Sequence, residues 1–216
     1  MTRETETMRA GYYRLMVYAA IFGALSSLIT TGYITIYNLG IKLFGQPSLF
    51  VLNVNIWPLI LLGVAGVFIG LAIKHFGQHG GLGVAQKQYA QTGRLEYRKL
   101  PSIILQAFIG LWGGAAVGPE GPLVFLTGGI GTFISERLKL QKDDVQVLVY
   151  SSIAGAFGGF LGSPVVGAVG AFEYMFIKEL DFYRHLVPGL IAAAAGWSIY
   201  FAILHTSFLR SYTHHF

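Results

Sequence analysis

Two glutamates, Glu120 and Glu173, stand inside otherwise apolar stretches of the sequence. A carboxylate inside a membrane is costly, so each of them is a candidate functional residue. Glu120 belongs to the run Gly118 to Pro122, whose glycines let an ion approach the backbone and whose Pro122 suits the first turn of a helix. The free amides and the positive dipole end of such a helix attract a desolvated anion. The spacing therefore predicts an anion site with a carboxylate beside it.

The chemistry that Glu120 offers is that of a gate. Its ionised carboxylate can occupy the anion site and block it, and the protonated group can swing away. Burial favours the neutral form of a carboxyl group, which makes this exchange accessible. The alternative is that Glu120 makes a structural hydrogen bond that holds the helix break in place.

Composition places these residues in a membrane protein. The 216 residues are 54% hydrophobic and 12% charged, with a mean hydropathy of +0.58, whereas soluble domains are about 25% charged. Basic residues are spread over the connections, so the net charge of +5 predicts membrane orientation and no nucleic-acid partner. With no cysteine, disulfides and thiolate chemistry are excluded. Helix packing faces are predicted by glycines at small-xxx-small spacing, namely Gly66 and Gly70, Gly155 and Gly159, Gly158 and Gly162.

The charge pattern divides the chain into a polar segment 1–14, a membrane domain 15–209 and a polar tail 210–216. Residues 15–41 and 43–73 carry no charge, and each run is long enough to span a bilayer. The basic connection that follows is expected to face the cytoplasm, with the N-terminus on the same side. We therefore expect a multi-pass protein of the cell membrane with a cytoplasmic N-terminus.

The later apolar runs are interrupted. Residues 123–135, after the Gly118 to Pro122 break, are too few to cross a bilayer alone. Residues 145–172 are interrupted at Gly158, Gly159, Gly162, Ser163 and Pro164, which predicts two half-length helices. Residues 186–209 predict a last span. Irregular backbone inside a membrane survives where it lines a cavity, as in transport sites. The predicted fold class is all-α, a polytopic membrane protein with broken and half-length helices.

Three stretches of sequence resemble one known family. The run Gly118 to Pro122, followed by Leu123, Val124 and Phe125, resembles the signature of the CLC family of chloride channels and proton-coupled chloride transporters. The stretch Gly81 to Val84 stands where that family has its first anion-binding glycine motif, and residues 154–175 resemble its paired helices before an acidic pair. The resemblance covers residues 15–209 and implies one half of an inverted-repeat CLC-type fold.

The resemblance also implies a site. Glu120 would be the gate, and Glu173 and Tyr174 would occupy the inner-side proton-relay position. The implied anion contacts come from both motifs, namely Gly81, Leu82, Gly83, Val84, Gly118, Pro119, Gly121, Pro122, Leu123, Val124 and Phe125. The chain departs from the family where Pro119 replaces a basic residue, Leu82 a serine and Tyr174 the second acid. Because tyrosine holds its proton at neutral pH, we expect weak or absent proton coupling.

The function implied by the resemblance is a voltage-gated type of anion channel or transporter subunit for chloride or another small anion. No enzymatic activity, cofactor or metal is expected. The partners implied are the lipid bilayer, a second CLC half and a second copy in a homodimer formed through residues 165–175 and 186–204. The chain would be either a fragment of a longer gene product or a free-standing half. The alternatives are a non-conducting assembly partner, which needs no ionisable Glu120, and an intramembrane enzyme with Glu120 or Glu173 as base, for which the sequence offers no nucleophile.

Overall fold

The computed structural model describes residues 3–45, 50–51, 54–77, 81–116, 118–175 and 182–205. Its elements are, in chain order, α1 (Arg3–Phe44), β1 (Phe50–Val51), β2 (Val54–Asn55), α2 (Trp57–Phe76), α3 (Leu82–Thr92), α4 (Leu100–Trp112), α5 (Glu120–Arg137), α6 (Lys142–Leu161), α7 (Pro164–Tyr174) and α8 (Phe182–Leu204). The all-α prediction is confirmed. The sequence did not predict the small antiparallel hairpin of β1 and β2, in which Phe50 pairs with Asn55. The expected polar tail, residues 210–216, lies outside the described residues.

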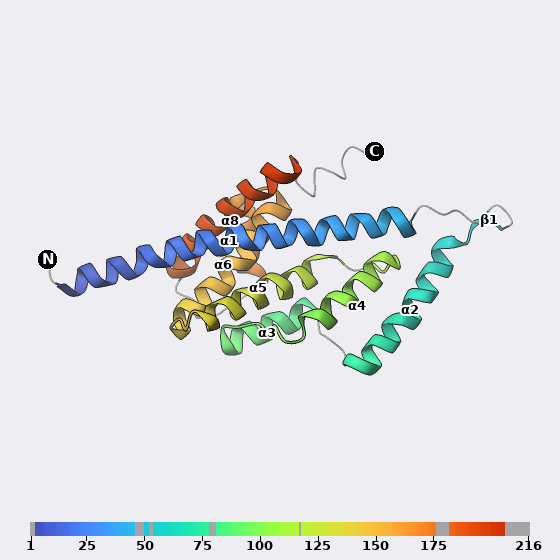
Figure 1. Cartoon of the computed structure of the whole chain (residues 1–216), viewed down its shortest axis with the longest axis horizontal. Coiled ribbons are helices and arrows are strands. Elements are labelled where there is room, and N and C mark those ends of the chain that lie inside the picture. The colour runs from blue at the N-terminus through green and yellow to red at the C-terminus, as the bar shows by residue number, and fades with distance from the viewer. Residues whose placement is uncertain are drawn as a thin grey trace.

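Four helices are long and apolar enough to cross a membrane, within residues 11–44 of α1, 57–76 of α2, 142–161 of α6 and 184–204 of α8. Helix α1 is one continuous helix that begins at Arg3, ahead of the first predicted span, and extends along most of the molecule (Figure 1). Helix α2 begins at Trp57 with Pro58 in its first turn, where a missing amide donor costs nothing. Two helices long and apolar enough to span a bilayer therefore precede the basic connection, and the second begins at Trp57 and Pro58, as the interfacial tryptophan and helix-starting proline predict.

Helices α1, α6, α7 and α8 form what we call the glycine-packed region. Gly155 of α6 lies so close to Gly23 of α1 that an added Cβ would overlap the Gly23 backbone. A Cβ added to Gly158 would likewise overlap the Ala193 backbone of α8 and lie 2.9 Å from its Cα. Ser27 Oγ of α1 donates a hydrogen bond to the Gly196 carbonyl of α8 at 2.6 Å. Small residues allow such close backbone approach in lipid, so the packing role predicted for the α6 glycines is confirmed.

The predicted division of residues 145–172 into two half-length helices is wrong in its first part. Helix α6 is a continuous helix of 20 residues, and Gly158 lies inside it. The break comes at Gly162, whose φ of +75° ends α6 in the left-handed conformation, so this glycine caps the helix. Ser163 Oγ then accepts a hydrogen bond from Val166 N at the start of α7. A left-handed glycine followed by a serine N-cap is a helix stop and start.

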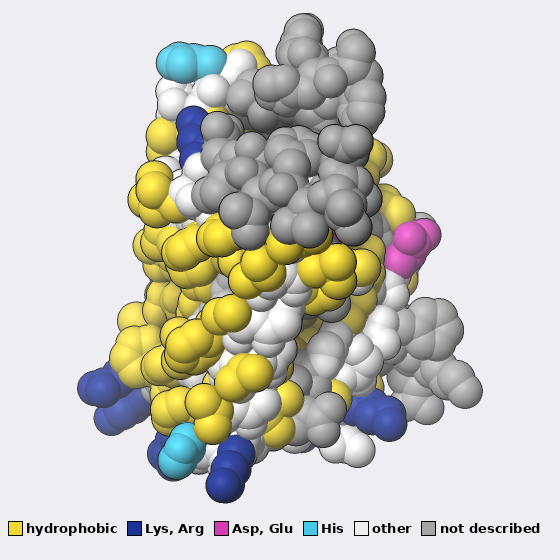
Figure 2. Space-filling model, turned by 90° about the vertical axis from the view of Figure 1, so that its right-hand side faces the viewer, with side chains coloured by type: hydrophobic (Ala, Val, Ile, Leu, Met, Phe, Trp, Pro, Cys, Tyr) yellow, Lys and Arg dark blue, Asp and Glu magenta, His cyan; other side chains and the backbone are white. Residues whose placement is uncertain are grey.

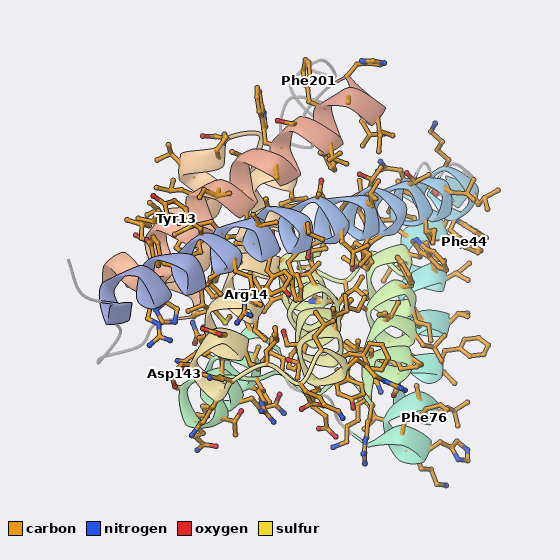
Figure 3. All side chains as sticks on the ribbon, turned by 60° about the vertical axis from the view of Figure 1, so that its left-hand side comes forward. Tyr13, Arg14, Phe44, Phe76, Asp143 and Phe201 are labelled. Carbon is orange, nitrogen blue, oxygen red and sulfur yellow. The ribbon has the colours of Figure 1, made fainter. Side chains whose placement is uncertain are left out.

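Helix α2 is packed far more loosely than α6. It contacts α4 and stands at the edge of the molecule, with side chains that project outward (Figure 3). In the 18-residue apolar stretch of each helix, 83% is buried in α6 and 11% in α2. Within the described structure no atom lies within 4 Å of a Cβ added at Gly66 or Gly70. The packing face predicted for these two glycines is therefore unoccupied within the part of the chain that the structure describes.

Charged residues connect the helices at one end of the molecule. Arg184 of α8 pairs with Asp143 of α6 at 3.1 Å, and Arg94 before α4 pairs with Glu136 of α5 at 3.1 Å. Figure 2 shows the face with α2, where hydrophobic side chains cover the middle and most of the visible lysine and arginine side chains lie toward one end. An apolar belt with a basic end is the charge distribution of a multi-pass membrane protein.

Candidate functional site

The predicted break around Glu120 is confirmed. Helix α4 ends at Trp112, and Gly114 turns the chain with a φ of +79° before α5 starts at Glu120. Pro119 is the N-cap residue, and its carbonyl accepts a hydrogen bond from Leu123 N at 3.1 Å. Pro122 in the first turn of α5 has no amide proton. The break thus follows from a left-handed glycine on one side and a proline-bearing helix start on the other.

Aromatic rings hold the end of α4 in place beside this break. Phe108 stacks on Tyr33 of α1 and on Trp112, with 4.9 Å between ring centroids in both pairs. Trp112 Nε1 also donates a hydrogen bond to the Tyr37 carbonyl at 3.2 Å. These contacts hold the end of α4 on α1. The irregular segment between α4 and Glu120 therefore begins at a fixed position.

The Glu120 side chain is half-buried at the start of α5. Its Oε2 lies where a Cβ on Gly118 would be, so the carboxylate folds back over the backbone of Gly118. A helix start favours a negative charge, because its first amides lack intrahelical acceptors and the dipole there equals roughly half a positive charge. Glycine at position 118 is therefore required for this placement of the carboxylate.

A second helix start meets the first. Helix α3 begins at Leu82 after the N-cap Gly81, with no side-chain hydrogen bond at the cap. A Cβ added to Gly121 of α5 would lie 3.7 Å from Leu82 N, which places the first amides of α3 beside the first turn of α5. The two glycine motifs, far apart in the sequence, thus present two sets of backbone donors to one place.

Tyr89 fixes α3 to the rest of the molecule. Its side chain is fully buried, and its hydroxyl donates a hydrogen bond to the Gln146 carbonyl of α6 at 2.8 Å. Burial, as the largest cause, holds the pKa of Tyr89 well above its ordinary value, because the charged phenolate would lose its hydration. The hydroxyl therefore stays a donor, and the start of α3 is held relative to the α5–α6 pair.

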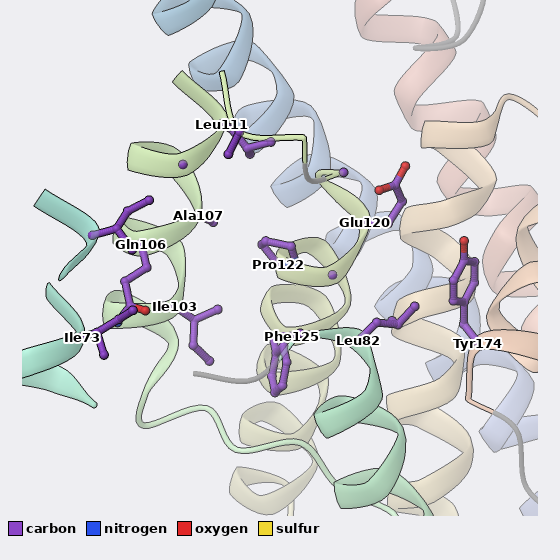
Figure 4. A pocket seen from close by; sticks show the side chains of 16 residues that line it. Ile73, Leu82, Ile103, Gln106, Ala107, Leu111, Glu120, Pro122, Phe125 and Tyr174 are labelled. Atoms are coloured by element: carbon purple, nitrogen blue, oxygen red, sulfur yellow. The ribbon is translucent and has the colours of Figure 1, made fainter. Parts of the chain in front are cut away.

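Both helix starts open into a cavity of about 520 Å³ (Figure 4). The predicted site residues that line it are Gly81, Leu82, Gly118, Glu120, Gly121, Pro122, Phe125 and Tyr174. The remaining predicted residues do not line it: Gly83, Val84 and Glu173 are exposed elsewhere, while Pro119, Leu123 and Val124 are buried. Glu120 and Tyr174 thus share one cavity, and Glu173, next to Tyr174 in sequence, is outside it.

Helices α2 and α4 contribute a wall of the cavity that the sequence did not predict. Ile69 and Ile73 of α2 line it together with Ile103 and Gln106 of α4. Gln106 Nε2 donates hydrogen bonds to the Gly77 carbonyl and to Ser102 Oγ, both at 3.2 Å, and so ties α4 to the end of α2. A single glutamine in the otherwise apolar stretch of α4 was the signal that could have identified this residue.

The donors around this cavity suit an anion. Two helix starts supply backbone N–H groups, and Glu120 is an acid that can compete with the anion for them. Among the described residues, no group of three histidine, aspartate or glutamate side chains could hold a metal ion. The two helix starts can contribute backbone donors to a site for a small anion.

Comparisons with known proteins find a family model and relatives that match most of this chain. The family model described as "Voltage gated chloride channel" matches residues 65–216. A "Chloride/fluoride channel protein" of Pseudomonas syringae pv. tomato is 25% identical over 158 residues, which are 71% of this chain and 35% of that protein. A "Putative ion-transport protein YfeO" of Escherichia coli is 27% identical over 161 residues, or 74% of this chain and 38% of that protein. The chain therefore spans little more than a third of these relatives.

A solved structure has the same fold. The crystal structure of "a slow cyanobacterial Cl-/H+ antiporter" matches 90% of this chain and 48% of its own with a TM-score of 0.71, at 19% identity. The described helices therefore correspond to about half of that transporter.

Proposed function

Since this chain belongs to the voltage-gated chloride channel family, the CLC family, we propose that it forms one half of an anion pathway gated by Glu120. The observation that carries the proposal is the cavity in which Glu120 meets the starts of α3 and α5. An ionised Glu120 carboxylate competes with the anion for the backbone donors, and protonation removes that competition. Chloride is the proposed substrate. Fluoride is the second candidate, because one relative is named as a chloride/fluoride channel protein.

We propose that a second half completes the pathway. A bare anion in a low-dielectric medium loses solvation worth of order tens of kcal/mol by the Born estimate, which two helix starts alone do not replace. The apolar side chains that α2 exposes, such as Leu59 at 69% and Val67 at 64%, leave room for further packing in the complete protein. The solved antiporter chain, about twice as long as its match to this chain, supports the same proposal.

We propose orientation and assembly on similar grounds. The gathering of lysine and arginine at one end supports a cytoplasmic location of that end in the cell membrane, together with the N-terminus. Exposed apolar side chains on α7 and α8, such as Val165 at 61% and Phe201 at 47%, support a homodimer formed through these helices.

The proposal is tested by anion flux. The protein encoded by the complete coding sequence that contains this chain, and the chain by itself, are reconstituted into vesicles loaded with chloride. A chloride electrode then follows efflux against protein-free vesicles. We expect pH-dependent efflux from the complete protein, larger than from the chain by itself. No efflux from either, with folding intact, would favour the non-conducting assembly partner.

Proton coupling is expected to be weak. A tyrosine, Tyr174, stands at the implied inner relay position in place of the second acid. A chloride gradient imposed on vesicles of the wild-type protein should therefore drive little uphill proton movement, as measured with a pH dye. Stoichiometric proton pumping would contradict this prediction and would direct attention to Glu173 as the relay.

A further inference from the structure

The cavity contains few polar side chains among its described lining residues, namely Gln106, Glu120 and Tyr174. The Gln106 amide group already donates to the Gly77 carbonyl and to Ser102 Oγ. An ionised Glu120 carboxylate accepts hydrogen bonds and donates none, and the protonated group, which has an O–H donor, is the form proposed to swing away from the site. Tyr174 therefore carries the side-chain donor of this cavity that has no other acceptor within the described structure.

Packing fixes the position of Tyr174. Its ring lies edge-on against the buried Phe157 of α6, with centroids 5.4 Å apart and an interplanar angle of 75°. Helix α7 is held on α6 by the backbone contact of Gly167 with Gly158 and by the 2.8 Å hydrogen bond from Tyr150 Oη to the Ala168 carbonyl. The side chain is half-buried, and its hydroxyl end is turned toward the Glu120 side of the cavity (Figure 4). The hydroxyl is thus presented to the cavity from a rigid support.

We propose that the Tyr174 hydroxyl donates a hydrogen bond to the anion in this cavity and thereby sets which anions the site prefers. The inference rests on the proposed function and adds a ligand and a selectivity determinant to it. Backbone amides at the two helix starts serve any anion that fits. A hydroxyl donor favours small, strongly hydrated anions. These anions give up the most hydration free energy on entering the site, so their binding depends most on a donor that replaces water.

The role is that of a ligand and not of a proton relay. The Tyr174 hydroxyl is a hydrogen-bond donor whether Glu120 is ionised or protonated. Its neighbour Glu173 is exposed outside the cavity. The side-chain chemistry that Tyr174 brings to the cavity is therefore a constant hydrogen-bond donor.

The test is the set of flux ratios among fluoride, chloride and bromide through Tyr174→Phe, which removes the hydroxyl and keeps the ring on Phe157. Fluoride, chloride and bromide efflux are measured from vesicles of the complete protein. The matched control is Tyr97→Phe, a half-buried tyrosine that lies edge-on to Phe133 at 5.2 Å and does not line the cavity. A hydrogen bond to a charged group contributes enough for a roughly tenfold change in binding, so we expect roughly that shift in apparent chloride affinity.

The flux ratios should shift toward bromide in Tyr174→Phe and stay at the wild-type value in Tyr97→Phe. A ratio measured in one set of vesicles does not depend on how much protein folded. If the wild type conducts and Tyr174→Phe keeps both its ratios and its affinity, the inference is wrong and the proposed function stands. If Tyr174→Phe changes only proton movement, the residue is a relay and the inference is again wrong. If the folded wild type passes no anion, both fail.

Discussion

The glycine-packed region and the cavity region, which comprises α2, α3, α4 and the first turn of α5, use the same residue type in opposite ways. In the first, Gly155 and Gly158 let backbones touch, and a Cβ at either position would collide with another helix. In the second, Gly81 and Gly121 line an open cavity, and an added Cβ would meet no atom closer than 3.7 Å.

The covered glycines of the first region contribute to stability, and the uncovered glycines of the second contribute to the site. Close helix contact in lipid depends on small residues, because no hydrophobic effect drives helices together there. A site that binds an ion through its backbone needs small residues too, but it needs them uncovered. Glycine content by itself therefore does not locate the site, whereas the space around each glycine does.

The largest expected effect lies in the glycine-packed region. Gly158→Ala would place a methyl group against main-chain atoms of Ala193, and neither these atoms nor a Cβ can rotate away. Overpacking costs about 1–3 kcal/mol and occasionally more, and we expect the upper end or beyond. Thermal unfolding in detergent should show a much lower melting temperature or no monodisperse protein. A melting temperature equal to the wild type would contradict the packing described for α6 and α8.

The next effect lies in the cavity region and concerns activity. Gly118→Ala puts a methyl group where Glu120 Oε2 now lies, so the carboxylate has to leave its place. We expect folded protein whose flux at neutral pH rises several-fold and depends less on pH. Gly32→Ala in α1, where an added Cβ meets no atom within 4 Å, is the matched control and should behave as wild type. An unchanged pH profile in Gly118→Ala would mean that the carboxylate position does not control flux.

The smallest effect is expected in α2. Gly66→Ala adds a methyl group in open space within the described structure, and replacing glycine in a helix interior gains roughly 0.5–1 kcal/mol at most. The chain by itself should therefore melt at the same temperature or slightly higher. A clear drop in melting temperature would show that Gly66 packs against something, and the contrast between the two regions would be weaker than described.

The sequence predicts most of the fold and the key acid of the site. Charge-free runs identify α1 and α2, and the proline and glycine residues around Glu120 identify the break before α5. Gly158 and Gly159 were misjudged as part of a break, because a glycine that packs and a glycine that ends a helix look alike without the neighbouring helix. Gly162 differs in being followed by Ser163 and Pro164, which is the local signal that α6 ends there.

The walls of the cavity could not be predicted in the same way. Ile69 and Ile103 are apolar residues in apolar helices, and only the contact of α2 with α4 brings them to the site. Tyr174 and Glu173 are adjacent in sequence, yet only the first faces the cavity. Which of two neighbouring polar residues enters a cavity depends on the rotation of α7 against α6, and this rotation is set by the contact of Gly167 with Gly158.

The most direct test of the central claim is anion flux through Glu120→Gln as a function of pH. The glutamine amide stands for the protonated, open form of the gate, so flux should be high and should no longer change with pH, whereas wild-type flux should rise as pH falls. Glu136→Gln, at the far end of the same helix and paired with Arg94, should retain the wild-type profile. Flux at background in Glu120→Gln, with a normal elution profile and melting temperature, would contradict the gate and assign Glu120 a structural role.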